Sequence, residues 1–191
     1  PGDVTDDTAI LARWDDNNKR ALAGEIVEED VRFTVGNEER YLHNIIAPIK
    51  DGDDIRGILG INIDITERKR SAELLELMRL SVEYGSDAIF WMNRDGSIAY
   101  VNEQACRSLG YVRADLLLLR LWQVDPNFSR DTWDEAWRAL TETGSFHAET
   151  RHRRHDGSEF PVEVNAIAIT YEGRTYAIGF ACDITERKQV E

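Results

Sequence analysis

Four histidines are the residues of this chain best suited to acid–base or metal chemistry, and their spacing matches no catalytic arrangement. His43, His147 and His152 fall in segments with strand-like alternation, which places His147 and His152 on opposite faces of a strand. His155 lies in an expected turn. Carboxylates are plentiful, but none is spaced beside a nucleophile, and there is no glycine-rich phosphate-binding loop. We therefore expect no catalytic residue, no metal site and no enzymatic activity in this chain.

The two cysteines, Cys106 and Cys182, do not form a C-x-x-C pair. A disulfide framework and a thiolate zinc site are therefore both disfavoured. We expect both cysteines to be packing residues, and this cysteine usage fits a reducing compartment.

The charge balance bears on the partners of the chain. Hydrophobic residues make up 42% and charged residues 31%, as in an ordinary globular protein, and the formal net charge is −13. Such an acidic chain repels a phosphate backbone, so nucleic acid is disfavoured as a partner. The longest apolar run, Leu116 to Leu119, is too short to span a bilayer, and no signal peptide is visible. We therefore expect a cytoplasmic location without membrane contact.

The strongest organising feature is a repeated hexapeptide. The sequence Asp-Ile-Thr-Glu-Arg-Lys occupies residues 64–69 and recurs at residues 183–188, 119 positions later. An identity of this length, at the spacing of one small domain plus a linker, indicates a tandem repeat. The stretch before the first hexapeptide is shorter, so we expect the first repeat to lack its beginning.

Each hexapeptide follows three alternating apolar and polar segments separated by glycine-containing turns, which predicts a three-stranded antiparallel meander in each repeat. The expected strands are residues 145–154, 159–170 and 175–182 in the second repeat, and 25–34, 39–47 and 56–63 in the first. Pro48 lacks a backbone N–H, so we expect it to end the middle strand of the first meander. A helix is expected over residues 5–22, with Leu11, Trp14 and Leu22 as candidate core contacts.

The second repeat carries further elements before its meander. Residues 88–92 and 97–101 are expected to form a hairpin. Asn102 is placed to cap a helix that Gly110 ends, and a later helix over residues 129–143 has one apolar face.

This order of elements, closed by the Asp-Ile-Thr-Glu-Arg-Lys motif, resembles a PAS domain with its C-terminal PAC motif. The matching segments are Asp87-Ala88-Ile89, Asp95-Gly96, Tyr100-Val101-Asn102, Leu109-Gly110-Tyr111, Trp122 with Asp125-Pro126, and His155-Asp156-Gly157-Ser158. The resemblance implies an α+β fold with a five-stranded antiparallel sheet and short helices on one face. It divides the chain into the C-terminal part of a first PAS domain at 1–66, with a PAC motif at 64–69, a linker helix at 67–84, and a complete second PAS domain at 85–188, with a PAC motif at 183–188.

Members of this family sense ligands, bind cofactors or mediate dimerisation within larger signalling proteins. The resemblance therefore implies a sensory input module whose parent carries an output domain beyond Glu191. A sensor histidine kinase of a two-component system is the first expectation for that parent, and a diguanylate cyclase the second. The alternative function is a dimerisation scaffold that binds no ligand.

The repeated motif begins a helix in both copies. Asp64 or Thr66 in the first copy, and Asp183 or Thr185 in the second, can cap that helix with a side-chain oxygen. The resemblance implies that these residues, together with Arg187, transmit a change in the sheet to the following helix. The residues alone leave open a second interpretation, an ordinary helix start without a signalling role.

The segment from Thr66 to Tyr84 is expected to be one amphipathic helix. Its apolar stripe is formed by Leu74, Leu75, Met78 and Val82. We expect a homodimer formed through this linker helix or through the sheet face. Packing of the helix on its own domain is the alternative.

A small-molecule pocket is expected between the helix at 129–143 and the sheet. Its candidate residues are Trp133, Trp137, Leu140, Val162 and Val164. The alternative is that the two tryptophans fill this space, because large aromatic side chains leave little room. The helix carries no histidine, which disfavours haem, and the segment around Cys106 does not match the cysteine motif of flavin photosensors, which disfavours flavin. The sequence names no ligand and no cofactor.

Overall fold

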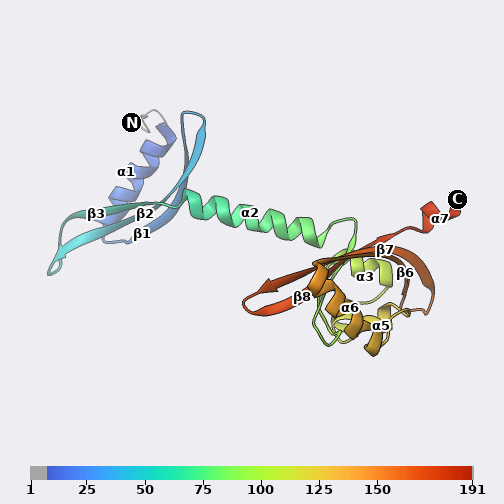
Figure 1. Cartoon of the computed structure of the whole chain (residues 1–191). Coiled ribbons are helices and arrows are strands. Elements are labelled where there is room, and N and C mark those ends of the chain that lie inside the picture. Colours follow the sequence, from blue (N-terminus) through green and yellow to red (C-terminus); the bar gives the residue numbers. More distant parts are fainter. Residues whose placement is uncertain (1–7, 191) are drawn as a thin grey trace. The chain divides into compact units, whose positions relative to one another are not determined.

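The structure is a computed structural model, and it describes residues 8–190. The chain divides into two compact units, with the division at Glu76 and Leu77 inside helix α2 (Thr66–Glu83). Each unit has a sheet of its own (Figure 1). Residues 5–7, the start of the predicted N-terminal helix, lie outside the described residues, as does the start of the predicted first domain.

The first unit is a three-stranded antiparallel meander with one helix against it. Its elements are α1 (Thr8–Leu22), β1 (Val27–Val35), β2 (Glu38–Asp51) and β3 (Asp54–Asp64). The sheet order is β1-β2-β3, so among residues 8–190 β3 pairs on one side only. The small core contains Ala21, Val27 and Ile46, with Ile58 packed against it.

Helix α1 packs with a different face from the one predicted. Leu11 and Leu22 are exposed and Trp14 is half-buried, whereas Asn17 is buried. The side-chain amide of Asn17 donates to the carboxylate of Glu29 on β1 at 2.6 Å. The helix therefore meets the sheet through a polar contact at Asn17 as well as through the apolar contact of Ala21.

Strand β2 runs past Pro48, so the prediction that Pro48 ends this strand is wrong. The pairs between β1 and β2 stop at Val27 and Ile46, and beyond them β2 pairs with β3 alone, with Pro48 opposite Ile58. The missing N–H therefore falls where β2 has a strand on one side only, a position at which proline is tolerated.

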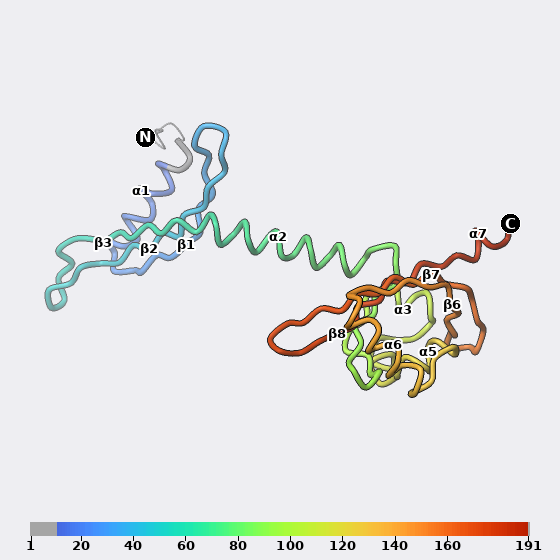
Figure 2. Tube along the Cα trace, viewed as in Figure 1, coloured from blue at the N-terminus to red at the C-terminus, as the bar shows by residue number. Residues whose placement is uncertain are grey.

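The second unit is built on a five-stranded antiparallel sheet of order β5-β4-β8-β7-β6. The strands are β4 (Ala88–Met92), β5 (Ile98–Val101), β6 (Ser145–Arg153), β7 (Glu159–Tyr171) and β8 (Arg174–Asp183). The helices are α3 (Glu103–Leu109), α4 (Arg113–Leu116), α5 (Leu121–Val124), α6 (Arg130–Thr143) and α7 (Thr185–Val190). Helices α3, α5 and α6 lie over one face of the sheet (Figures 1 and 2). The predicted α+β fold is therefore confirmed.

Asn102 joins three elements of the second unit. Its side-chain oxygen caps α3 by accepting from the N–H of Ala105, and it also accepts from the N–H of Ile89 on β4, both at 2.9 Å. Its amide group donates to the carbonyls of Val82 on α2 and Asp87 before β4. The four hydrogen bonds offset the desolvation of this fully buried amide, which holds the segments together.

One apolar core fills most of the space between the helices and the sheet. Helix α6 begins at the N-cap Ser129 and ends at Gly144, whose φ of 82° is left-handed backbone that glycine adopts without strain. The core includes Phe90, Val101, Leu109, Leu116, Trp137, Leu140, Phe160 and Val162.

Within the described part of the chain, no helix is long and apolar enough to cross a membrane.

The two meanders end with the same main-chain contact. The N–H of Ile65 donates to the carbonyl of Tyr41 at 2.9 Å, and the N–H of Ile184 donates to the carbonyl of Pro161 at 3.1 Å. In each case the next residue begins a helix, α2 or α7. Both copies of the hexapeptide therefore connect the last strand of a meander directly to a helix.

Candidate functional site

A cavity of about 360 Å³ lies between helices α5 and α6 and the inner face of the second sheet. The space is left open because small residues form much of the cavity floor and one of its sides. These are Ala136 on α6, Ala148 on β6, Ala166 on β7, and Ala177, Gly179 and Ala181 on β8. Pockets that bind small molecules in proteins commonly have about 300–1,000 Å³.

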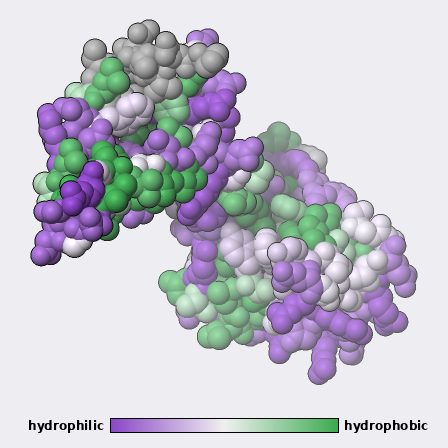
Figure 3. Space-filling model, turned by 90° about the vertical axis from the view of Figure 1, so that its left-hand side faces the viewer, coloured by the Kyte–Doolittle hydropathy of each residue, from purple (hydrophilic) through white to green (hydrophobic). Residues whose placement is uncertain are grey.

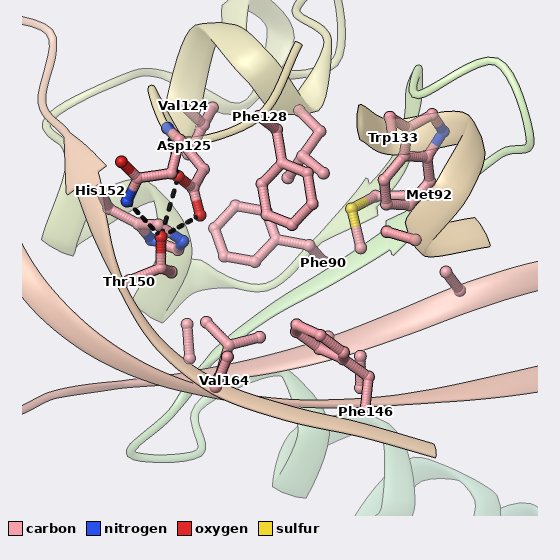
Figure 4. A pocket seen from close by; sticks show the side chains of 18 of the residues that line it. Phe90, Met92, Val124, Asp125, Phe128, Trp133, Phe146, Thr150, His152 and Val164 are labelled. Carbon is pink, nitrogen blue, oxygen red and sulfur yellow. Dashed lines mark hydrogen bonds between the residues drawn. The ribbon is translucent and has the colours of Figure 1, made fainter. Parts of the chain in front are cut away.

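The walls of the cavity are largely apolar and aromatic. Phe90 and Met92 enter from β4, Phe128 and Trp133 from the segment around the start of α6, and Phe146 from β6 (Figure 4). Phe128 and Trp133 meet edge to face, with ring centroids 6.2 Å apart. These side chains offer a dry surface to an apolar ligand.

Polar groups gather at one end of the cavity, around Asp125 (Figure 4). Asp125 is 1% exposed, and its carboxylate accepts hydrogen bonds from the Thr150 hydroxyl at 2.8 Å and the N–H of Asn127 at 2.9 Å. The side-chain amide of Asn127 donates to the same hydroxyl at 2.8 Å. Burial raises the pKa of Asp125, since the charged form loses its water.

His152 lines the same end of the cavity and is 4% exposed. Its ring lies edge to face with Phe90 at 5.6 Å and with Phe160 at 6.0 Å. Burial lowers the pKa of His152 to about 4, so the imidazole is neutral at neutral pH. Among the described residues, Nδ1 of this ring has no hydrogen-bond partner.

Three of the five predicted pocket residues line this cavity, namely Trp133, Leu140 and Val164. Trp137 and Val162 do not line it; both are buried in the adjoining core. The alternative that the two tryptophans fill the space does not describe this structure. Trp133 is held to one side by its indole N–H, which donates to the carbonyl of Arg94 at 2.8 Å.

Sequence reasoning missed the polar end of the cavity. From the sequence, Thr150 and His152 lie in a predicted strand, and Asp125 belongs only to a segment that matches the family pattern. The usable signal was the alternation along β6, because Phe146, Ala148, Thr150 and His152 are every second residue and all four line the cavity. The floor had a similar signal in Ala177, Gly179 and Ala181 on β8.

At the first junction, Asp64 and Thr66 contact each other, as the capping hypothesis requires. The N–H of Thr66 donates to Oδ1 of Asp64 at 2.9 Å, and hydrogen bonding by Thr66 lowers the pKa of this carboxyl. The hydroxyl oxygen of Thr66 accepts from the N–H of Tyr41 on β2 at 2.9 Å. Thr66 therefore links the start of α2 to the neighbouring strand.

At the second junction, Oδ1 of Asp183 accepts from the N–H of Thr185 at 2.8 Å and from its hydroxyl. Arg187 donates to Glu149 on β6 at 2.6 Å and approaches Glu163 on β7 at 3.4 Å. Asp64 and Asp183 thus hold the helix starts at the ends of the two meanders, and Arg187 connects α7 to β6 and β7. They do not contact the cavity directly, although Glu149 lines it.

The predicted apolar stripe of α2 is exposed in the single chain. Leu74, Leu75 and Met78 are each more than half exposed, and Val82 is 37% exposed. Hydrophobic surface is also visible on each unit among hydrophilic side chains (Figure 3). At the C-terminal end of α2, Glu83 is buried and pairs with Arg113.

The cysteines differ from each other in their surroundings. Cys106 is buried in the core, whereas Cys182 is exposed, so the expectation that Cys182 packs is wrong. Cys182 lies on the sheet face opposite the cavity, which helices α3, α5 and α6 do not cover. In the described part of the chain, no cluster of three or more histidine, cysteine or acidic residues has the geometry of a metal site.

Known proteins resemble this chain in both sequence and fold. The family model of the PAS domain matches residues 86–186, more than half of the chain. Comparison with curated proteins gave no match.

Solved structures similar to this one are PAS and sensor domains. The PAS domain of an HTR-like protein from Haloarcula marismortui is 26% identical, with a TM-score of 0.58 over 62% of this chain and 98% of that one. A PAS domain from a two-component sensor histidine kinase is 22% identical, with a TM-score of 0.51 over 59% and 98%. A domain of a sensory box sensor histidine kinase/response regulator from Geobacter sulfurreducens is 24% identical, with a TM-score of 0.50 over 59% and 96%.

The match over residues 86–186 coincides with the five-stranded sheet, its covering helices and the cavity between them. The chain belongs to the PAS domain family.

Proposed function

We propose that this chain is the sensory input and signal-transmission module of a multidomain signalling protein, and that it has no enzymatic activity of its own. A small molecule bound in the cavity is the signal. The observation that carries this proposal is the course of β8. Ala177, Gly179 and Ala181 of this strand form the floor of the cavity, and Asp183, two residues later, holds the first turn of α7.

The proposed relay needs few steps. A ligand that moves the floor shifts β8 and its main-chain partner β7 together, because the two strands are paired from Val162–Asp183 to Tyr171–Arg174. The N–H of Ile184 is bonded to the carbonyl of Pro161 on β7, so a movement of the two paired strands carries the start of α7 with it and changes the direction in which α7 leaves the sheet. Asp183, Thr185 and Arg187 would set that direction.

We propose a sensor histidine kinase as the parent protein and a cytoplasmic location for this module. The support is fold similarity to domains from two sensor histidine kinases, together with the absence of a membrane-spanning helix in the described part of the chain. A diguanylate cyclase remains the second parent proposed. The output domain would receive the signal through the helix that begins at Thr185.

We also propose that the first unit is the C-terminal part of a first PAS domain, so that the chain is a tandem with a linker helix. Two observations favour it. The β1-β2-β3 meander ends in the same main-chain contact as β6-β7-β8. In addition, β3 has a free edge where β8 is paired with β4, and its residues Leu59, Ile61 and Ile63 are exposed.

A ligand-free dimerisation scaffold is the competing function. The exposed stripe of Leu74, Leu75 and Met78 on α2 favours a homodimer, and it would exist with or without a ligand. The sensory function requires an empty space that a ligand can enter, whereas a scaffold does not. For a scaffold the cavity would only reduce the stability gained from packing.

Native mass spectrometry of the freshly purified chain tests the proposal, with the denatured mass as reference. We expect an additional mass that is lost on denaturation. The variant Ala136→Leu, which adds a side chain into the cavity, should lack that mass. The matched variant Ala139→Leu, on the exposed face of the same helix, should keep it.

Hydrogen–deuterium exchange then tests the relay. Loss of the bound molecule should change amide exchange in residues 183–190 of the wild type and of Ala139→Leu. A protein that carries no additional mass, takes up no apolar probe and forms a stable dimer would replace the sensory function with the scaffold. Uptake of a ligand without any change in residues 183–190 would overturn the relay alone.

A further inference from the structure

We propose that the ligand of this cavity is a neutral amphipathic molecule with an apolar, aromatic-sized body and a single hydroxyl head that meets Nδ1 of His152. This inference rests on the proposed ligand-binding function and narrows it to a chemical class. The cavity has two chemically different ends, and each end selects a different part of such a molecule.

The body of the ligand is selected by the aromatic end. Phe90, Phe128, Phe146 and Trp133 surround this part of the cavity, and the floor opposite them is alanine and glycine (Figure 4). Flat rings gain from edge-to-face and stacked contact with such side chains. A polar body would lose its hydration here and find no partner, because the polar lining residues lie at the other end.

The head of the ligand is selected by His152. This side chain is buried, it lines the cavity, and its Nδ1 has no hydrogen-bond partner among the described residues. A buried polar atom without a hydrogen-bond partner destabilises the protein. A ligand that supplies this partner removes the penalty, and the free energy recovered adds to its binding. A hydroxyl group both donates and accepts, so it satisfies Nδ1 whichever ring nitrogen carries the proton.

The absence of charge on the ligand follows from the other polar groups. Asp125 places its carboxyl group at the polar end of the cavity, and among the described residues no lysine or arginine lines the cavity, which opposes a carboxylate or phosphate head. A cation is opposed by burial. His152 itself shows this, because burial alone lowers its pKa to about 4 and no neighbouring carboxylate offsets the effect. A ligand ammonium in the same place would meet the same penalty.

The test compares four naphthyl probes that share one body and differ in the head: 2-naphthol, naphthalene, 2-naphthoate and 2-naphthylmethylammonium. Binding to the full chain is measured at pH 7 by equilibrium dialysis with detection of naphthyl fluorescence. We expect 2-naphthol to bind about three- to tenfold more tightly than naphthalene, the size of one net hydrogen bond. The two charged probes should bind more weakly than naphthalene.

Two variants assign the preference to His152. His152→Phe keeps a ring between Phe90 and Phe160 and removes both nitrogens, so 2-naphthol and naphthalene should bind equally. His152→Asn places an amide near the position of Nδ1 and should retain the preference for 2-naphthol. Both variants are compared at matched folded concentration, and the wild-type probe series remains decisive if either variant fails to fold.

The possible failures are distinguishable. Binding of none of the four probes would overturn the ligand-binding function itself. Equal binding of naphthalene and 2-naphthol by the wild type would leave that function standing and overturn the hydroxyl head. Tightest binding by the ammonium or the carboxylate probe would overturn the neutral class, and an unchanged preference in His152→Phe would overturn the role of His152.

Discussion

Thr150 on β6 and Asp125 after α5 are bonded side chain to side chain, with the Thr150 hydroxyl 2.8 Å from Oδ2 and 3.0 Å from Oδ1 of the carboxylate. The bond joins the helical cover of the cavity to the edge strand of the sheet. It also gives a nearly inaccessible carboxyl one of its two donor residues, the other being Asn127. The polar end of the cavity is therefore part of the structural framework as well as part of the proposed site.

Replacing Thr150 by valine should destabilise the second unit. The variant keeps the shape of the side chain but leaves the buried carboxyl of Asp125 with fewer donors, at a cost of about 1–3 kcal/mol. Urea unfolding followed by tryptophan fluorescence measures this cost. The control is Thr170→Val, which removes an exposed hydroxyl bonded to Thr175 and should change stability by less than about 0.5 kcal/mol. Equal effects of the two substitutions would contradict the importance of the Asp125 contact.

His152 should make the stability of the chain fall below neutral pH. Its pKa is about 4 in the folded chain against 6.5 for an ordinary histidine, so between these values the unfolded chain binds a proton that the folded chain does not. The contribution of neutral His152 to the free energy of unfolding is therefore complete above pH 6.5 and is lost as the pH falls towards 4. The loss amounts to about 2 kcal/mol between pH 7 and pH 5.

The variant His152→Phe isolates this contribution. Asp125, whose pKa burial raises, acts with the opposite sign, since the folded state takes up a proton at higher pH than the unfolded state. Asp125 titrates in both proteins, so the difference between their urea-unfolding profiles at pH 7 and pH 5 belongs mainly to His152. Parallel pH profiles would show that His152 is not neutral and buried.

Removing the Asp183 carboxylate should loosen the first turn of α7. Asp183→Ala deletes the acceptor for the N–H and hydroxyl of Thr185, and we expect faster amide exchange in residues 185–190 with little change in the sheet. The control is Asp156→Ala, which deletes the same pair of contacts to Ser158 in the β6–β7 turn. Equal exchange of α7 in both variants would mean that Asp183 does not hold this helix.

Asn102 should be the most sensitive polar residue of the second unit to truncation. Asn102→Ala removes a helix cap, leaves the buried N–H of Ile89 without its acceptor and takes the donor from the partly buried carbonyls of Val82 and Asp87, so we expect a loss of about 2–4 kcal/mol. Thermal unfolding measures it. Ser129→Ala removes an exposed cap from α6 and should cost about 1 kcal/mol. A cost for Asn102→Ala no larger than that for Ser129→Ala would contradict this account.

Most of the strands could be predicted from the sequence, because each meander combines alternating residues with turns that contain glycine. The position of Pro48 shows where this reasoning stops. Whether a proline ends a strand depends on how far the neighbouring strand extends. Strand β1 begins at Val27, opposite Ile46, and the sequence does not reveal that its pairing with β2 stops short of Pro48.

The cavity was predicted in place but only partly in composition. Trp133 and Leu140 were found because they share the apolar face of α6, and Trp137 lies on that face without reaching the cavity. The side of the strand that carries His152 followed from alternation. Its burial did not, because burial depends on the helices that cover that face, and such long-range packing leaves no local pattern.

Under the proposed function, the floor of alanine and glycine on β7 and β8 would separate ligand recognition from signal transmission. Strand pairing uses main-chain atoms, so enlarging the residue at 166, 177 or 181 changes the depth of the cavity and leaves the ladder that leads to Asp183 in place. In a domain that works as proposed, ligand selectivity could therefore change by one methyl group at a time while the connection from β8 to α7 stays the same.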